Sequence, residues 1–69
     1  MTIKRSSITS KQLEVIKLID EGLTSYEIGL EMGIRENTVK SHRQTAMGLL
    51  GVNNAGDLVR VCKEENLIE

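Results

Sequence analysis

Aromatic residues are almost absent from this sequence, which has one tyrosine, Tyr26, and neither phenylalanine nor tryptophan. The hydrophobic core must therefore be aliphatic. Binding of single-stranded nucleic acid on an aromatic stacking platform is nearly excluded for the same reason. No apolar run approaches the length of a membrane span, and Met1 is followed by no apolar signal-peptide core. We therefore expect a cytoplasmic protein without a membrane partner.

Cysteine and histidine occur once each, as Cys62 and His42. One residue of each kind cannot make a structural zinc site, and we expect neither a metal nor another cofactor. Cys62 lies in a helical pattern with Leu58 and Val59, which favours a buried small hydrophobic residue over a reactive thiol. The sequence also has no nucleophile–base pair and no phosphate-binding loop, so an enzyme is not predicted.

Charge is nearly balanced over the 69 residues, with a net value of −1, but it is unevenly distributed. Basic residues predominate in residues 1–12 and 35–53, and acidic residues predominate in the two stretches that follow them. Affinity for phosphate comes largely from lysine and arginine, so this polarity predicts a modest basic face that can meet nucleic acid. An ordinary solvated surface is the alternative for any single charge.

We predict one all-α domain with a four-helix, helix-turn-helix fold, preceded by a basic arm. The arm is predicted to be flexible over residues 1–8, and the domain covers residues 9–69. The helices are expected at about residues 10–21, 25–32, 36–50 and 55–65. Ile8, at the junction, is placed to pack across the first turn of the first helix.

Capping residues signal where two of these helices begin. Thr9 with Gln12, and Thr24 with Glu27, have the spacing of capping boxes, in which each side chain bonds the other residue's backbone N–H. The third helix has no such signal, because Arg35 occupies the position where Ser, Thr, Asp or Asn would accept a backbone N–H.

Residues 24–43 have the order of features of a helix-turn-helix. Gly29 supplies a small residue where two helix backbones approach, and Gly33 supplies a turn residue that can take positive φ. Helical spacing directs Ile28 from the first helix and Val39 from the second into the space between them. An αα-hairpin that only packs against the core is the alternative interpretation.

The third helix has two different faces when its residues are placed about 100° apart. The inner arc holds Val39, His42, Ala46, Leu49 and Leu50. The outer arc holds Asn37, Lys40, Ser41, Gln44 and Gly48. Lysine can donate to guanine acceptors, asparagine and glutamine suit adenine, and serine suits either, although a solvated polar face would look similar. Arg43 lies at the margin, where its head can reach a phosphate, and His42 is expected to be half-buried.

From Ile8 to Ile68 the chain resembles the LuxR/GerE-type DNA-binding domain of bacterial transcription regulators. The residues that carry the resemblance are Thr9, Glu14, Val15, Gly22, Glu27, Ile28, Thr38, Val39, Lys40, His42, Leu50, Gly51 and Val52. The resemblance implies a third helix in the major groove and a fourth helix that mediates dimerisation on a two-fold DNA site. In that family the residues matching Lys40, Ser41 and Gln44 face the bases.

The sequence departs from this family at several positions. Arg35, Gln12 and Gly29 stand where serine, glutamate and alanine are usual, and these changes concern stability. Leu49 and Ala55 stand where members often carry basic residues near the DNA backbone. The resemblance therefore implies weaker phosphate binding here.

For the fourth helix, spacing places Ala55, Leu58, Val59 and Cys62 on a core-facing arc and leaves Val61 on a flank without an evident internal partner. A helix-turn-helix monomer of this size makes few base contacts, and a two-fold pair is the usual way to gain affinity. We assign the dimer contact to Val61 and Leu58.

The predicted function is that of a sequence-specific regulator of transcription that binds double-stranded DNA as a homodimer at the bacterial nucleoid. Base contacts are assigned to Lys40, Ser41, Gln44 and Asn37. Phosphate contacts are assigned to Arg43, Thr38, Thr24 and Arg35. The alternative is a protein-interaction module that pairs with another regulator and binds DNA weakly or not at all. Another regulator or RNA polymerase is a further candidate partner.

Overall fold

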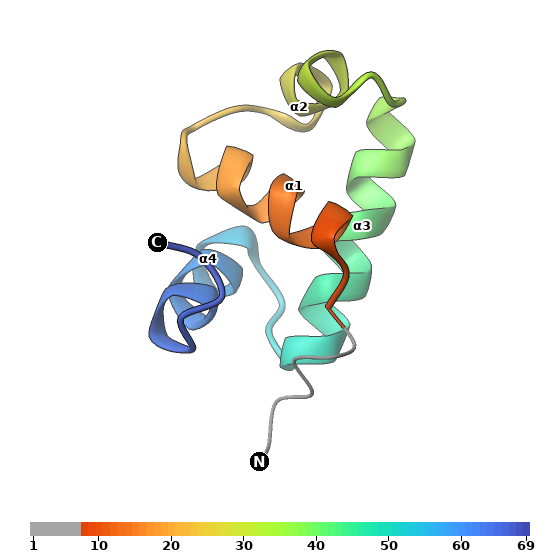
Figure 1. The fold of residues 1–69 in the computed structure, drawn as a ribbon. Coiled ribbons are helices and arrows are strands. Elements are labelled where there is room, and N and C mark those ends of the chain that lie inside the picture. The colour runs from red at the N-terminus through yellow and green to blue at the C-terminus, as the bar shows by residue number, and fades with distance from the viewer. Residues whose placement is uncertain (1–7) are drawn as a thin grey trace.

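The structure, a computed structural model, describes residues 8–69. This part of the chain contains four helices joined by short turns (Figure 1). They are α1 (Ser10–Asp20), α2 (Ser25–Met32), α3 (Glu36–Leu50) and α4 (Ala55–Glu64). The all-α prediction is confirmed. The predicted boundaries differ at two ends, because Glu21 and Glu65 are the C-cap residues of α1 and α4 and do not belong to the helices.

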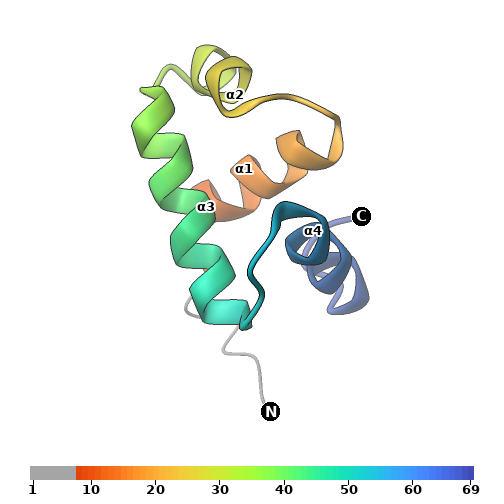
Figure 2. The ribbon, with the colours of Figure 1, turned by 180° about the vertical axis from the view of Figure 1, so that it is seen from behind.

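Helix α1 lies in the middle and contacts each of the other helices. Helix α3, the longest, runs along one side of the molecule, with α2 near its first turns and α4 near the opposite end (Figures 1 and 2). Neither view shows another described helix along the outer side of α3. One face of α3 is therefore left open.

Both predicted capping boxes are present. The Thr9 hydroxyl accepts from the Gln12 backbone at 3.1 Å, and the Gln12 side chain accepts from the Thr9 backbone at 2.9 Å. The corresponding distances for Thr24 and Glu27 are 3.2 and 2.8 Å. Arg35, as expected, makes no side-chain cap bond at the start of α3. The first two helices thus begin with a side-chain cap, and α3 does not.

Buried apolar residues form two clusters. The small cluster lies between α1, α2 and α3 and consists of Val15, Ile28 and Val39, all fully buried. The large cluster joins α1, α3, α4 and the C-terminal tail, and its buried members are Ile8, Ile16, Ala46, Leu50, Leu58, Cys62 and Ile68. Ile8 is 8% exposed, so it belongs to the folded domain and not to a flexible arm; the other residues assigned to the arm, 1–7, lie outside the described residues.

The turn between α2 and α3 depends on two glycines. Gly33 has φ of 69°, in the left-handed region that glycine adopts without a Cβ penalty. A Cβ on Gly29 would lie 2.7 Å from the carbonyl oxygen of Ile34, so the backbone of the turn would have to shift to accommodate a side chain. The Ile34 backbone N–H donates to the carbonyl of Gly29 at 3.0 Å. The predicted roles of both glycines are confirmed, and they set how α3 leaves α2.

Candidate nucleic-acid interface

The outer face of α3 is polar and open to solvent. Asn37, Lys40, Ser41 and Gln44, the residues assigned to base contacts, are all exposed. On the opposite side Val39 and Ala46 are fully buried. The structure therefore brings the predicted base-contacting residues together on one accessible helix face, held in place from behind by the core.

Lys40 is the charged residue in the middle of this face, and it has a partner within its own helix. Its ammonium lies 3.2 Å from the Glu36 carboxylate, one turn earlier, and both side chains are about half exposed. Exposed ion pairs at this spacing contribute little to stability. Lys40 can consequently leave Glu36 for an acceptor on a ligand at small cost. This pair was not predicted from the sequence, although the four-residue spacing of opposite charges signals it.

The residues assigned to phosphate contacts surround this face, and they differ in accessibility. Thr24, Arg35 and Thr38 are exposed. Arg43 is partly buried, and its Nη1 atom donates to the Ser25 hydroxyl oxygen at 2.8 Å. Ser25, the first residue of α2, is only 7% exposed and was not among the predicted site residues. Arg43 is thus already engaged within the protein.

Leu49 was predicted on the inner arc of α3, but its side chain is 38% exposed. The row of buried residues runs through Val39, Ala46 and Leu50, and Leu49 lies about 100° from Leu50 around the helix. Helical spacing predicts the direction in which a side chain points. It does not show whether a neighbouring helix covers that side chain. His42 is partly buried, as expected.

The dimer assignment requires correction at Leu58, which is fully buried in the large cluster and offers no surface to a partner. Val61 is partly exposed, but it packs against the same cluster, so the expectation that it has no internal partner is wrong. The outward side of α4 is charged: Arg60 lies 3.6 Å from Asp57 and 3.0 Å from Glu64. Val61, at the edge of α4, is an apolar residue of this helix that remains partly accessible.

Two features of α2 were not predicted from the sequence. Tyr26 is 60% exposed and Leu30 is 68% exposed, and the two lie one turn apart on the outer side of this helix. Glu27 and Glu31 are exposed on the same helix, which has no basic residue. The outer side of α2 is therefore apolar and acidic, unlike the outer face of α3.

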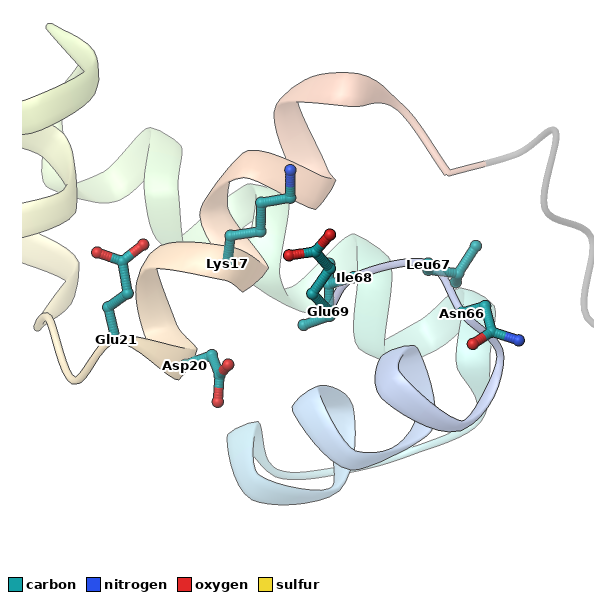
Figure 3. A pocket seen from close by; sticks show the side chains of 7 residues that line it. All are labelled: Lys17, Asp20, Glu21, Asn66, Leu67, Ile68 and Glu69. Atoms are coloured by element: carbon teal, nitrogen blue, oxygen red, sulfur yellow. The ribbon is translucent and has the colours of Figure 1, made fainter.

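Other groups with reactive or ligand-binding side chains are poorly placed for chemistry. Cys62 is buried in the core, and burial raises the pKa of its thiol, which disfavours the reactive thiolate. Within residues 8–69 no three His, Cys, Asp or Glu side chains gather as metal ligands. A pocket between the end of α1 and the C-terminal tail is lined by Lys17, Asp20, Glu21 and residues 66–69 (Figure 3). Carboxylates predominate in this lining, so it does not suit a phosphate group.

None of the described helices is both long enough and apolar enough to cross a membrane.

Comparison with known proteins identifies the family of this domain. A sequence model described as "Bacterial regulatory proteins, luxR family" matches residues 6–62. The two-component response regulator PprB of Pseudomonas aeruginosa is 37% identical over 51 residues, which are 74% of this chain and 18% of that protein. The transcriptional regulatory protein YdfI of Bacillus subtilis is 30% identical over 63 residues, which are 91% of this chain and 30% of that protein.

Among solved structures, the response regulator ChrA of a heme-sensing two-component system is similar with a TM-score of 0.87 and 25% identity. The similarity covers 93% of this chain and 32% of that one. The chain thus spans between 18% and 32% of the length of these proteins. What it shares with them is one domain, and that domain contains the whole candidate interface.

Proposed function

This chain belongs to the luxR family of bacterial regulatory proteins, and we propose that it regulates transcription by placing α3 in the major groove of a specific DNA site. The family is one of DNA-binding regulators and not of enzymes. The observation that carries the proposal is the division of α3 into a buried inner face and an exposed polar outer face. A helix with one open polar face fits the major groove, where each base pair presents a distinct set of donors and acceptors.

In this proposal the outer residues of α3 divide the recognition of bases. Lys40 donates to guanine acceptors after leaving Glu36, Gln44 and Asn37 bind adenine edges, and Ser41 binds either kind of base. These residues lie on successive turns of α3. They therefore follow the groove over a few base pairs.

Phosphate contacts come from both helices of the helix-turn-helix. Thr24 caps the N-terminus of α2, while Arg35 and Thr38 lie at the start of α3. The exposed N-terminal ends of helices favour negative charge, and Arg35 adds a full positive charge there. These contacts orient the protein without reading sequence.

We further propose that the protein acts as a homodimer through the edge of α4 near Val61, on a two-fold DNA site. A single α3 contacts few bases, and pairing two copies on adjacent half-sites raises both affinity and site length. Most of the outward side of α4 carries ion pairs, and the apolar contact is small. The dimer is accordingly weak in solution and becomes tighter on DNA. The bacterial cytoplasm, at the nucleoid, is the proposed place of action.

A second candidate function rests on α2. The exposed pair Tyr26 and Leu30, beside Glu27 and Glu31, is better suited to a protein than to a phosphate backbone. In this alternative the domain pairs with another regulator or with RNA polymerase and binds DNA weakly or not at all.

Binding to duplex DNA over a range of salt concentrations separates the two candidates. The wild-type chain should select a preferred duplex from a random pool, and log K should fall steeply with log salt, by about 0.9 for each phosphate contacted. Lys40→Ala and Gln44→Ala should each cost about 1–3 kcal/mol on the selected duplex, with unchanged thermal stability. Lys17→Ala, which removes an exposed lysine of α1 outside the predicted basic stretches, is the matched control and should leave selection intact. Absence of measurable binding would favour the protein-interaction module.

The dimer has its own test. Val61→Glu should weaken binding to a full palindrome far more than binding to one half-site, because a buried charge opposes association. Since Val61 also packs against the core, Val61→Thr serves as a milder variant whose folding is checked by circular dichroism. Equal losses on the palindrome and the half-site would rule out this interface.

A further inference from the structure

One side-chain hydrogen bond joins α2 to the middle of α3. Arg43 Nη1 donates to Ser25 Oγ at 2.8 Å, across eighteen residues of sequence. The Arg43 Nε atom is buried and has no hydrogen-bond partner in the described structure. Burying a donor without a partner costs free energy, so Arg43 is a poor choice for stability alone. Its placement points to a role in geometry.

The position of this bond gives it leverage on the helix-turn-helix. The two helices are joined at the turn, where Gly29 and Gly33 fix the backbone. From that turn, Ser25 lies about 12 Å back along α2, and Arg43 lies about 12 Å forward along α3, at a rise of 1.5 Å per residue. The Arg43–Ser25 bond closes the third side of this triangle. It therefore opposes any change in the angle between the helices.

The proposed DNA contacts lie on either side of the same bond. Thr24, the proposed phosphate contact, directly precedes Ser25. Lys40 lies one turn before Arg43 on α3, and Gln44 directly follows it. A change in the angle between α2 and α3 would move Thr24 relative to the base-contacting residues, and both sets of contacts could no longer be made at once.

We infer that Arg43 is a positioning residue, which sets the angle between α2 and α3 through Ser25 and so aligns phosphate contacts with base contacts. This inference rests on the proposed function. It differs from the prediction made from the sequence, in which Arg43 binds a phosphate directly. The guanidinium group suits the task, because its planar donors hold a partner in a fixed direction better than a flexible ammonium does.

The test compares Ser25→Ala, Arg43→Met and the double variant in the full chain. Each protein is titrated against the duplex selected by the wild type and against a random duplex, at several salt concentrations, and its melting temperature is measured. Ser10→Ala is the matched control for Ser25, because Ser10 is the first residue of α1. Arg60→Met, on α4, is the matched control for the loss of one positive charge.

If Arg43 positions the helices, both single variants weaken binding to the selected duplex by a similar factor, on the order of tenfold, and the double variant is no weaker. Binding to the random duplex and the salt dependence stay unchanged, since a random duplex is bound without specific base contacts and, in this proposal, neither substitution removes a charged residue that contacts phosphate. The two controls keep wild-type selectivity.

Other outcomes overturn the inference. If Arg43 binds phosphate directly, Ser25→Ala has no effect, whereas Arg43→Met weakens both duplexes and reduces the salt slope by about 0.9. If the bond is only structural, the melting temperatures fall while the preference for the selected duplex, measured well below them, is unchanged. A wild-type chain that binds no duplex overturns the proposed function together with the inference; normal wild-type binding with either of the first two patterns overturns the inference alone.

Discussion

The two core clusters differ in size and in what they support. The large cluster has seven buried members drawn from α1, α3, α4 and both ends of the described chain. The small cluster has three, Val15, Ile28 and Val39, and it holds the helix-turn-helix together. Many side chains contribute to the large cluster, whereas in the small cluster each of its three helices contributes one fully buried residue.

The contrast explains why the turn needs stricter local chemistry than the rest of the fold. With so few buried side chains, apolar contact alone specifies the angle between α2 and α3 weakly. The steric limit at Gly29, the positive φ of Gly33 and the bond between Arg43 and Ser25 add direction to that contact. Orientation of the proposed DNA-binding face thus depends on a small number of specific atoms.

Paired isoleucine truncations test this difference most strongly. Ile28→Ala in the small cluster and Ile16→Ala in the large one remove the same atoms from fully buried sites. Each should lower the free energy of unfolding by about 2–5 kcal/mol, measured by urea denaturation. At a temperature where both variants remain folded, Ile28→Ala should lose much more affinity for the selected duplex, because α2 shifts on α3. Equal losses of affinity would mean that the small cluster does not control the interface.

Substitutions at two glycines with open space around them should give the next largest change in stability. A Cβ added at Gly33 or at Gly48 would meet nothing within 4 Å, so only backbone conformation separates the two positions. Gly33→Val should destabilise by about 1–2 kcal/mol because φ is 69° there. Gly48→Ala, inside α3, should instead stabilise by about 1 kcal/mol. Thermal melts of both variants, with Gly33→Asn as a substitution that tolerates positive φ, decide the point. An unchanged melt for Gly33→Val would contradict the proposed turn.

Arg35, at the start of α3, makes no side-chain cap bond and is also a proposed phosphate contact. Arg35→Ser should add the missing cap and raise stability by about 1 kcal/mol. The same change should weaken binding to selected and random duplexes alike and reduce the salt slope by about 0.9, because one phosphate contact is lost. Arg35→Ala is the control, with the same loss of binding and no gain in stability. A variant that is more stable and binds normally would remove Arg35 from the interface.

Local signals in the sequence were sufficient for most of the fold. The boxes at Thr9 and Thr24 marked the starts of two helices, and Gly33 marked the turn, because each depends on residues a few positions apart. The inner side of α3 at Val39 and the openness of its outer side at Lys40 followed from helical spacing.

Contacts between distant segments were not predictable in this way. The packing of Val61 against the large cluster and the exposure of Leu49 depend on how the helices pack together, which spacing within one helix does not reveal. Similarly, nothing local indicates that Arg43 meets Ser25, since the bond exists only after α2 and α3 have packed. The base and phosphate contacts remain predictions.

The smallest predicted effect is a difference between the two capping boxes in how their contribution to stability depends on pH. In α1 the box uses the neutral Gln12, whereas in α2 it uses the carboxylate of Glu27. The hydrogen bond from the Thr24 backbone, followed by that from its side chain, lowers the pKa of Glu27 below its ordinary value of 4.5. A carboxyl whose pKa is lower in the folded state stabilises the protein above its unfolded pKa, and this contribution is lost as pH falls through the folded pKa.

Acid should therefore loosen the start of α2 and leave the start of α1 unaffected by this route. Glu27→Gln keeps an acceptor for the Thr24 N–H but cannot titrate. Subtracting its stability curve, measured by thermal melts between pH 7 and pH 3, from that of the wild type removes the contribution of the other carboxyls. The difference should be small and should change only at acidic pH, with the wild type losing stability relative to the variant. A difference that is constant across this range would show that the Glu27 carboxylate is not held by Thr24 in solution.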